Sequence, residues 1–258
     1  MSALLAEAAP RRAAALPFQP LHPEFGAEIL DLGAPLPPAL QTRLEAALAA
    51  HRLLLLRDQS LRPAQLATLA ARLAGTAAAP APAEVAPEAL AGWAFDRAAP
   101  QRPSRLQALF VAAAPAPGLA AEFAGQHAVL AGLHPWLAHR IEYLEAVTPA
   151  GPLPLVRAGR AGPGRSLFLP PEATALTGLP QAEAAALLPR LRAAATAPAF
   201  TWRLALRQGD LLLWDGHALL HRLLPGQGGA QPPLLHAAAG PEAPLGAAAA
   251  ATPFLIAG

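Results

Sequence analysis

The residues best placed to do chemistry follow a short apolar segment in the carboxy-terminal part of the chain. Leu211–Trp214 is an apolar run that is long enough for a buried strand and too short for a helix. Asp215–Gly216 then gives a turn signal, and His217, His221 and Arg222 follow it. Because a strand fixes the backbone while the loop beyond it presents side chains, we expect this segment to contribute a functional histidine.

The spacing of these two histidines also allows a zinc pair. On a helix, His217 and His221 would share one face, as zinc-binding histidines do, but no glutamate accompanies them in the H-E-x-x-H pattern. We therefore favour a role for His221 without His217. Three other histidines fall on predicted helical segments, where surface or half-buried histidines are commoner than metal ligands. They are His127, His134 and His139.

Several kinds of site are excluded or disfavoured by composition and motif. The chain has no cysteine, so disulfides, thiolate metal sites and a cysteine nucleophile are excluded. No serine stands in a G-x-S-x-G elbow, and Gly159–Gly164 lacks the strand–helix context and lysine of a phosphate loop. The arginines of Arg157–Arg165 could bind an anionic ligand, although the pattern favours a solvated hairpin loop.

The overall composition indicates a protein with a sizeable core. Of its 258 residues 54% are hydrophobic, with 31 prolines and 20 glycines that indicate many turns. The net charge is only +2, there is no lysine, and the arginines are scattered, so we expect no nucleic-acid partner. No apolar run reaches the roughly 18 residues of a membrane span. We therefore expect a cytoplasmic protein that does not enter a membrane.

The elements that must position these residues are many short strands with helices between them. Strands are predicted over Phe18–Leu32, Leu53–Leu56, Gln107–Ala113, Leu153–Val156, Ser166–Leu169, Thr201–Leu206, Leu211–Trp214 and Leu234–Ala237, and helices over Pro37–His51, Leu61–Leu73, Phe123–Val147 with a break at Pro135, and Gln181–Ala195. Gly75–Ala91 is predicted to be a loop. We expect one domain over residues 16–240, preceded by a disordered extension, 1–15, and followed by a low-complexity tail, 241–258. This pattern fits a jelly-roll core decorated by helices.

Two parts of the chain resemble the taurine dioxygenase-like (TauD/TfdA) family of Fe(II)/2-oxoglutarate-dependent dioxygenases. Gly209–Arg222 is similar to the family run G-D-hydrophobic-W-D-N that ends in H-R. Phe25–Glu28 reads F-G-A-E, and a helix, a strand ending in Arg57–Gln59 and a second helix follow, as in the family's amino-terminal third. The resemblance implies a mostly β fold with flanking helices around a double-stranded β-helix (jelly roll, cupin-like) core. It also implies descent from oxidoreductases.

The resemblance implies an incomplete iron site. In the family, two histidines and one carboxylate hold Fe(II). His221 takes the place of the distal histidine, and Asp96 that of the carboxylate in a W-H-x-D motif, which here reads Trp93-Ala94-Phe95-Asp96. Ala94 stands where the first histidine is expected, and a methyl group cannot ligate a metal. Asp96 and His221 are thus the two metal ligands implied, unless they persist only as a buried hydrogen-bonded pair.

The resemblance also implies that the 2-oxoglutarate contacts are missing. Pro233 sits where the family's carboxylate-binding arginine is expected, and Ala237 where a second arginine often stands. Within Gly118–Ala124, Ala121 replaces the threonine that touches 2-oxoglutarate. Losing the charge-assisted arginine contact should cost about 2–5 kcal/mol of binding. Fe(II) and 2-oxoglutarate are therefore implied by the resemblance alone, and the residues also allow that neither is bound.

Whether the chain is an enzyme is left open by its residues, and three functions are compatible with them. We favour a non-catalytic or regulatory binding homologue, with a small-molecule ligand, a second copy of itself or an active paralogue as partner. The alternative is an active Fe(II)-dependent oxygenase acting on a small organic acid, in which water or another side chain replaces the ligand lost at Ala94. A third is a jelly roll that binds a small hydrophobic or anionic molecule without chemistry.

Overall fold

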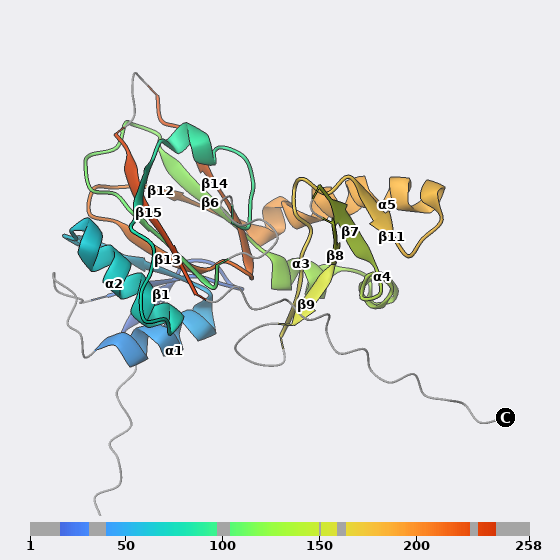
Figure 1. The fold of residues 1–258 in the computed structure, drawn as a ribbon, viewed down its shortest axis with the longest axis horizontal. Coiled ribbons are helices and arrows are strands. Elements are labelled where there is room, and N and C mark those ends of the chain that lie inside the picture. Colours follow the sequence, from blue (N-terminus) through green and yellow to red (C-terminus); the bar gives the residue numbers. More distant parts are fainter. Residues whose placement is uncertain are drawn as a thin grey trace, which may run out of the picture.

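The computed structural model describes residues 16–30, 40–96, 104–149, 151–158, 164–227 and 232–240. The predicted extension, 1–15, and the predicted tail, 241–258, lie outside these ranges. The described chain forms two lobes side by side (Figure 1). We call them the sandwich lobe, which holds the seven-stranded sheet and one of the two three-stranded sheets, and the second lobe, which holds the helices and strands within residues 126–195.

The larger sheet of the sandwich lobe has seven strands in the order β1-β2-β3-β13-β5-β15-β4. Its strands are β1 Phe18–Pro20, β2 Ala27–Ile29, β3 Leu53–Leu56, β4 Ala83–Val85, β5 Leu106–Phe110, β13 Leu211–Asp215 and β15 Leu234–Ala239. The two apolar runs predicted as buried strands, β3 and most of β13, pair antiparallel at the centre. Leu53–Leu56 is inaccessible to solvent along its whole length, because both faces of the sheet are covered.

The smaller sheet faces the larger one and closes the interior of the sandwich lobe. Its order is β12-β6-β14, with β12 Thr201–Ala205, β6 Ala120–Gly125 and β14 Leu219–Leu224. Side chains alternate along each strand, so that Leu55 and Leu212 of the larger sheet meet Phe123 and Leu223 of the smaller one in a single apolar cluster. This interior is the place where a ligand of a jelly roll would have to lie.

Two helices cover the outer face of the larger sheet (Figure 1). They are α1 Gln41–His51 and α2 Pro63–Ala74, and α2 begins with proline, where a missing N–H costs nothing. Leu54 and Leu56, which alternate with the interior leucines of β3, pack with Leu44 of α1 and Leu66 of α2. The sandwich lobe therefore has one apolar layer between its sheets and another beneath its helices.

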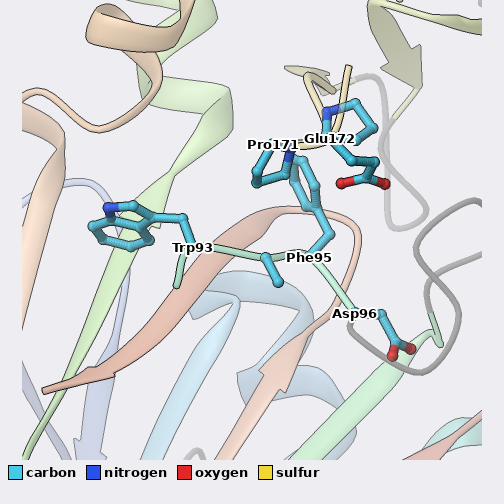
Figure 2. A pocket seen from close by; sticks show the side chains of 7 residues that line it. Trp93, Phe95, Asp96, Pro171 and Glu172 are labelled. Carbon is cyan, nitrogen blue, oxygen red and sulfur yellow. The ribbon is translucent and has the colours of Figure 1, made fainter. Parts of the chain in front are cut away.

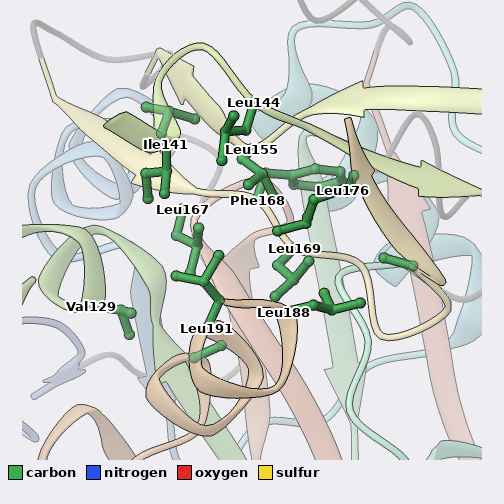
Figure 3. Packing of buried hydrophobic residues seen from close by; sticks show 14 of the residues in the cluster. Val129, Ile141, Leu144, Leu155, Leu167, Phe168, Leu169, Leu176, Leu188 and Leu191 are labelled. Atoms are coloured by element: carbon green, nitrogen blue, oxygen red, sulfur yellow. The ribbon is translucent and has the colours of Figure 1, made fainter. Parts of the chain in front are cut away.

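The second lobe has its own core (Figure 3). It contains β7 Glu145–Thr148, β8 Gly151–Pro154 and β11 Ala175–Thr177 in one sheet, β9 Val156–Ala158 and β10 Arg165–Leu167 in a hairpin, and the helices α3 Gln126–Gly132, α4 Pro135–Ile141 and α5 Gln181–Ala195. Leu155, Leu167 and Phe168 pack against Leu188 and Leu191 of α5. The core also includes Phe95, which comes from the segment that carries the candidate site.

The predicted fold class is confirmed: the chain is mostly strands with flanking helices, built on two facing sheets of a jelly roll. The strands of the described residues do not close into a barrel. Among the described helices the longest is α5 with 15 residues, and none has the length and apolarity needed to cross a bilayer.

Some predicted elements were wrong. The segment predicted as helix over Phe123–Val147 begins inside β6 and ends in β7, with two short helices between them. The alanines of β6 favour a helix by propensity, but pairing on both sides with β12 and β14 decides the outcome. The loop predicted over Gly75–Ala91 contains β4, which pairs with β15, and a 3-10 turn over Pro87–Leu90.

Two predicted strands are divided differently in the structure. Phe18–Leu32 was predicted as one strand, whereas β1 and β2 form a hairpin whose turn ends at Gly26 with φ +85°, which a glycine adopts without strain. The hairpin predicted from Leu153–Val156 and Ser166–Leu169 exists, but it pairs β9 with β10. Leu153 belongs to β8, which pairs with β7.

Candidate active site

The segment Trp93–Asp96 lies directly beside β14. The main-chain N–H of Ala94 donates to the carbonyl of His221 at 3.0 Å, and the N–H of His221 donates to the carbonyl of Ala94 at 2.9 Å. This reciprocal pair of bonds makes the two residues direct cross-strand partners. Their side chains therefore leave the backbone on the same face.

Alternation along this extended segment separates its side chains into two sets. Figure 2 shows Phe95 and Asp96 projecting to opposite sides of the chain. Phe95 stacks on Phe168 in the second lobe, with ring centroids 4.4 Å apart, and the Trp93 ring lies 4.6 Å from the guanidinium carbon of Arg222. Ala94 and Asp96 take the other set of positions, which is the face that carries His221.

Asp96 is buried and held by a backbone donor. Its side chain is 1% exposed, and its carboxylate accepts a hydrogen bond of 2.8 Å from the main-chain N–H of Ser104. Burial lowers the pKa of His236, and the charge of Asp96 partly offsets this by favouring the protonated imidazole. Asp96 therefore lies within electrostatic reach of a histidine from β15.

His221 lies in the interior with aromatic neighbours. It is 4% exposed, it is the register partner of Phe123 on β6, and its ring lies 4.9 Å from that of Trp214. Trp214 is in turn 6.1 Å from the ring of His236. The structure thus brings the two predicted ligands, Asp96 and His221, to the same face of the site and adds His236 nearby.

These residues do not fit a three-ligand iron site. The position opposite His221 carries the methyl group of Ala94, which offers no lone pair to a metal. Within the described ranges, no three side chains of the types His, Cys, Asp and Glu come together in a group that could hold a metal ion. Two ligands alone leave an iron ion bound more weakly than the three of a facial triad would.

The surrounding interior does not fit 2-oxoglutarate either. Ala121 is 1% exposed and faces the apolar cluster between the sheets, where Leu204, Leu212 and Leu223 are also buried. A dicarboxylate would need a cation at this depth. The neighbours of Ala121 in this cluster are apolar, and the polar side chains described above in the interior, Asp96, His221 and His236, include no arginine.

Pro233 and Ala237, predicted to stand at the places of the family's arginines, lie just before β15 and within it. Ala237 of β15 packs with the layer beneath α2, and Pro233 precedes the strand at an exposed position, so neither faces the interior. Leu234 and His236 are the β15 residues that do. The reason is the period of two in a strand: moving the register by one residue transfers each side chain to the opposite face. The conclusion that no arginine reaches the interior from β15 is unchanged.

The zinc pair is contradicted by the local backbone. His217 lies in the turn before β14, where its N–H donates to the Asp215 carboxylate at 2.8 Å, and His221 lies in the strand. The two do not share a helix face. Two of the other histidines have polar contacts away from this site. His127 Nε2 lies 3.0 Å from the carbonyl oxygen of Glu24, and His134 caps α4 by accepting from the N–H of Trp136.

Sequence reasoning missed two polar residues of the interior. His236 contacts the amide oxygen of Gln107 through Nε2 at 3.3 Å, and the amide nitrogen of Gln107 donates to the carbonyl of Phe95 at 2.6 Å. Gln107 is inaccessible to solvent. The signal was present in the alternation of Leu234–Ala239, because a histidine that shares a face with a buried leucine must lie in the interior.

A pocket of about 340 Å³ lies against the segment Trp93–Asp96 (Figure 2). Its walls come from Trp93–Asp96 on one side and from Pro170–Glu172 of the second lobe on the other. Figure 2 shows Phe95 pointing toward Pro171 and Glu172. The pocket is thus in contact with the segment that would carry the first two metal ligands, at the junction of the lobes.

Comparison with known proteins finds sequence similarity to one family of dioxygenases. The family model described as "Taurine catabolism dioxygenase TauD, TfdA family" matches residues 147–227. An alpha-ketoglutarate-dependent 2,4-dichlorophenoxyacetate dioxygenase from Burkholderia sp. (strain RASC) is 36% identical over 85 residues, which are 31% of this chain and 28% of that protein. The match therefore spans less than a third of that relative.

Solved structures extend the likeness to most of the chain. The complex of AAD-2 with Mn(II) and N-oxalylglycine superposes with a TM-score of 0.75 at 22% identity, covering 88% of this chain and 97% of that one. A taurine dioxygenase from Burkholderia xenovorans gives a TM-score of 0.74 at 23% identity, covering 88% and 89%. At these identities the likeness shows the fold. In its fold and in its matched segment, the chain is similar to proteins of the TauD/TfdA family.

Proposed function

We propose that this chain is a non-catalytic member of the TauD/TfdA family, which binds a small molecule or a partner protein without Fe(II)/2-oxoglutarate turnover. The observation that carries the proposal is the pairing of Ala94 with His221. The methyl group occupies the position from which a third ligand would reach the same metal as Asp96 and His221. Losing one ligand of three removes both affinity and the fixed geometry that oxygen activation requires.

The co-substrate side of the site supports the same proposal. The interior carries Ala121 in the place of a hydroxyl group, and Leu234 and His236 face it from β15. Burial lowers the pKa of His236, so this imidazole is neutral at neutral pH. The loss of a fixed cation costs about 2–5 kcal/mol of carboxylate binding, which is about 30-fold or more in affinity.

The alternative is an active oxygenase with an altered site, and one observation favours it. His236 lies near Trp214 and within electrostatic reach of Asp96, so it is the imidazole that could replace the ligand lost at Ala94. Such an enzyme would be an oxidoreductase acting on a small organic acid. 2,4-Dichlorophenoxyacetate, after which the Burkholderia relative is named, is an example of that substrate class.

Anaerobic Fe(II) titration by calorimetry, with and without 2-oxoglutarate, separates the two functions. The wild type and Ala94→His are compared, because the variant supplies the missing imidazole on the face that carries His221. Weak or no binding by the wild type and gain of binding by Ala94→His is the expected result. Tight wild-type binding that 2-oxoglutarate strengthens would refute the proposal, and His236→Gln would then identify the substitute ligand by abolishing it.

A further inference from the structure

The side chain of Arg157 is buried, and it forms no salt bridge within the described part of the chain. It is 2% exposed, and none of its three guanidinium nitrogens has a hydrogen-bond partner in the described part of the chain. Burial lowers the pKa of Arg157 to about 9, so the group remains charged at neutral pH. A buried cation of this kind is strongly unfavourable unless something outside the described contacts pairs with it.

The guanidinium is held in a defined orientation by an aromatic stack. Its central carbon lies 3.2 Å from the centroid of the Phe168 ring. Phe95 stacks on Phe168 at 4.4 Å, and two groups this close cannot share one face of a phenyl ring, so Phe168 lies between Arg157 and Phe95. Stacking fixes the plane of the guanidinium but satisfies none of its N–H donors.

A hydroxyl group accompanies the guanidinium on the same face of the hairpin. Arg157 of β9 and Ser166 of β10 are direct register partners, so their side chains project to the same side. Ser166 is 6% exposed. A planar fork of N–H donors next to a hydroxyl matches the two oxygens of a carboxylate.

We infer that Arg157 and Ser166 form a binding site for the carboxylate of a small monocarboxylic acid with an apolar body. One buried cation neutralises one negative charge, which favours a monocarboxylate over a phosphate dianion. The Phe168 ring lies against the guanidinium and Leu155 is buried in the same core, so the surroundings suit an aryl or branched aliphatic body. Asp96 and His221 take no part, and the inference therefore stands whether or not this protein binds iron.

The test uses benzoate as the probe, benzamide as its neutral isostere and inorganic phosphate as the alternative anion. Calorimetric titration of the full chain compares the wild type with Arg157→Met, which keeps the stem and removes the charge. Arg165→Met is the matched control, because this arginine lies on the same hairpin but is exposed and paired with Glu142. We expect benzoate to bind the wild type and Arg165→Met alike, and Arg157→Met about 30-fold more weakly or not at all.

Benzamide should not bind, and phosphate should bind more weakly than benzoate. Equal benzoate affinity in Arg157→Met, or no binding to the wild type, would overturn the inference. Because Arg157→Met could fail to fold, Ser166→Ala provides a second variant, expected to weaken benzoate binding about 2- to 10-fold through the loss of one hydrogen bond. An unchanged affinity in folded Ser166→Ala would exclude the hydroxyl from the site.

Discussion

The backbone of Ala94 and that of His221 exchange two hydrogen bonds, at 3.0 and 2.9 Å, across the edge of the smaller sheet. Residue 94 is therefore fixed opposite His221 by main-chain atoms, whatever its side chain is. This is why a single substitution can test the incomplete iron site. The backbone that would present the missing imidazole is already in place.

The first prediction concerns the identity of the other ligands. In the Ala94→His background, Asp96→Asn should remove most of the Fe(II) affinity that Ala94→His gains, because an amide is a much poorer ligand than a carboxylate. Anaerobic calorimetry on the single and double variants measures this. Ala94→Gln serves as a control for added volume without a metal ligand of similar strength. If the double variant binds as tightly as Ala94→His, Asp96 is not a ligand.

A second prediction concerns the aromatic centre of the interior. Trp214 is 1% exposed and contacts Phe123 edge to face, with centroids 5.5 Å apart. Trp214→Ala should lower the free energy of unfolding by about 3–5 kcal/mol, since it leaves a large cavity between the sheets. Urea denaturation followed by circular dichroism measures the loss. Trp136→Ala, at a position 63% exposed, should change stability by no more than about 0.5 kcal/mol.

A third prediction concerns the ion pair that ties the two central strands together. Arg57, at the end of β3, donates to both oxygens of Asp210 at 2.9 and 2.7 Å, and Asp210 is 1% exposed. Asp210→Ala should cost about 3–5 kcal/mol, because it leaves the guanidinium without its buried partner.

The matched control for this prediction is an exposed ion pair. Glu183→Ala removes the partner of Arg140 on the surface of α5 and should cost at most about 1 kcal/mol. Equal losses in Asp210→Ala and Glu183→Ala, measured by urea denaturation, would show that burial adds nothing to the pair between Arg57 and Asp210.

A fourth prediction concerns acid stability. Burial lowers the pKa of His127 from its usual 6.5, with Arg52 lowering it further, while the carbonyl and charge of Glu24 act in the opposite direction. Since the folded state binds this proton less readily than the unfolded state, the stabilising contribution is present above pH 6.5 and is lost as the pH falls toward the lowered value.

His127→Gln should therefore flatten the fall in stability between about pH 7.5 and 5.5, measured by urea denaturation at each pH. His139→Gln changes a side chain that is 71% exposed and should leave the pH dependence as it is in the wild type. A pH dependence unchanged in His127→Gln would assign the acid sensitivity to other groups.

The sequence was most informative about the secondary structure of the short apolar segments that form the buried strands. Leu53–Leu56 and Leu211–Trp214 could be predicted as strands, because these apolar runs are short and are bounded by turn signals. The family resemblance could be identified from fixed sequence order around Asp215 and His221. The fold class followed from these two signals, whereas Ala94 and Asp96 were assigned from the W-H-x-D motif, and their role beside His221 stays a prediction.

Other features depended on partners distant in the chain. The strand β6 is rich in alanine, and only its pairing with β12 and β14 makes it extended. The face of β15 that points inward depends on a register that the sequence alone leaves open by one residue. Arg157 was predicted to lie in a solvated hairpin loop, but it is buried, with its guanidinium against the ring of Phe168.

The segment Trp93–Asp96 belongs to two cores at once, and this has a thermodynamic consequence. Phe95 packs into the second lobe against the ring of Phe168, on which the guanidinium of Arg157 also stacks. Ala94 and Asp96 face the interior of the sandwich lobe. Any displacement of Phe168 on anion binding would be passed through one peptide unit to Asp96. In Ala94→His, benzoate and Fe(II) should therefore change each other's affinity by the same factor, as linkage requires.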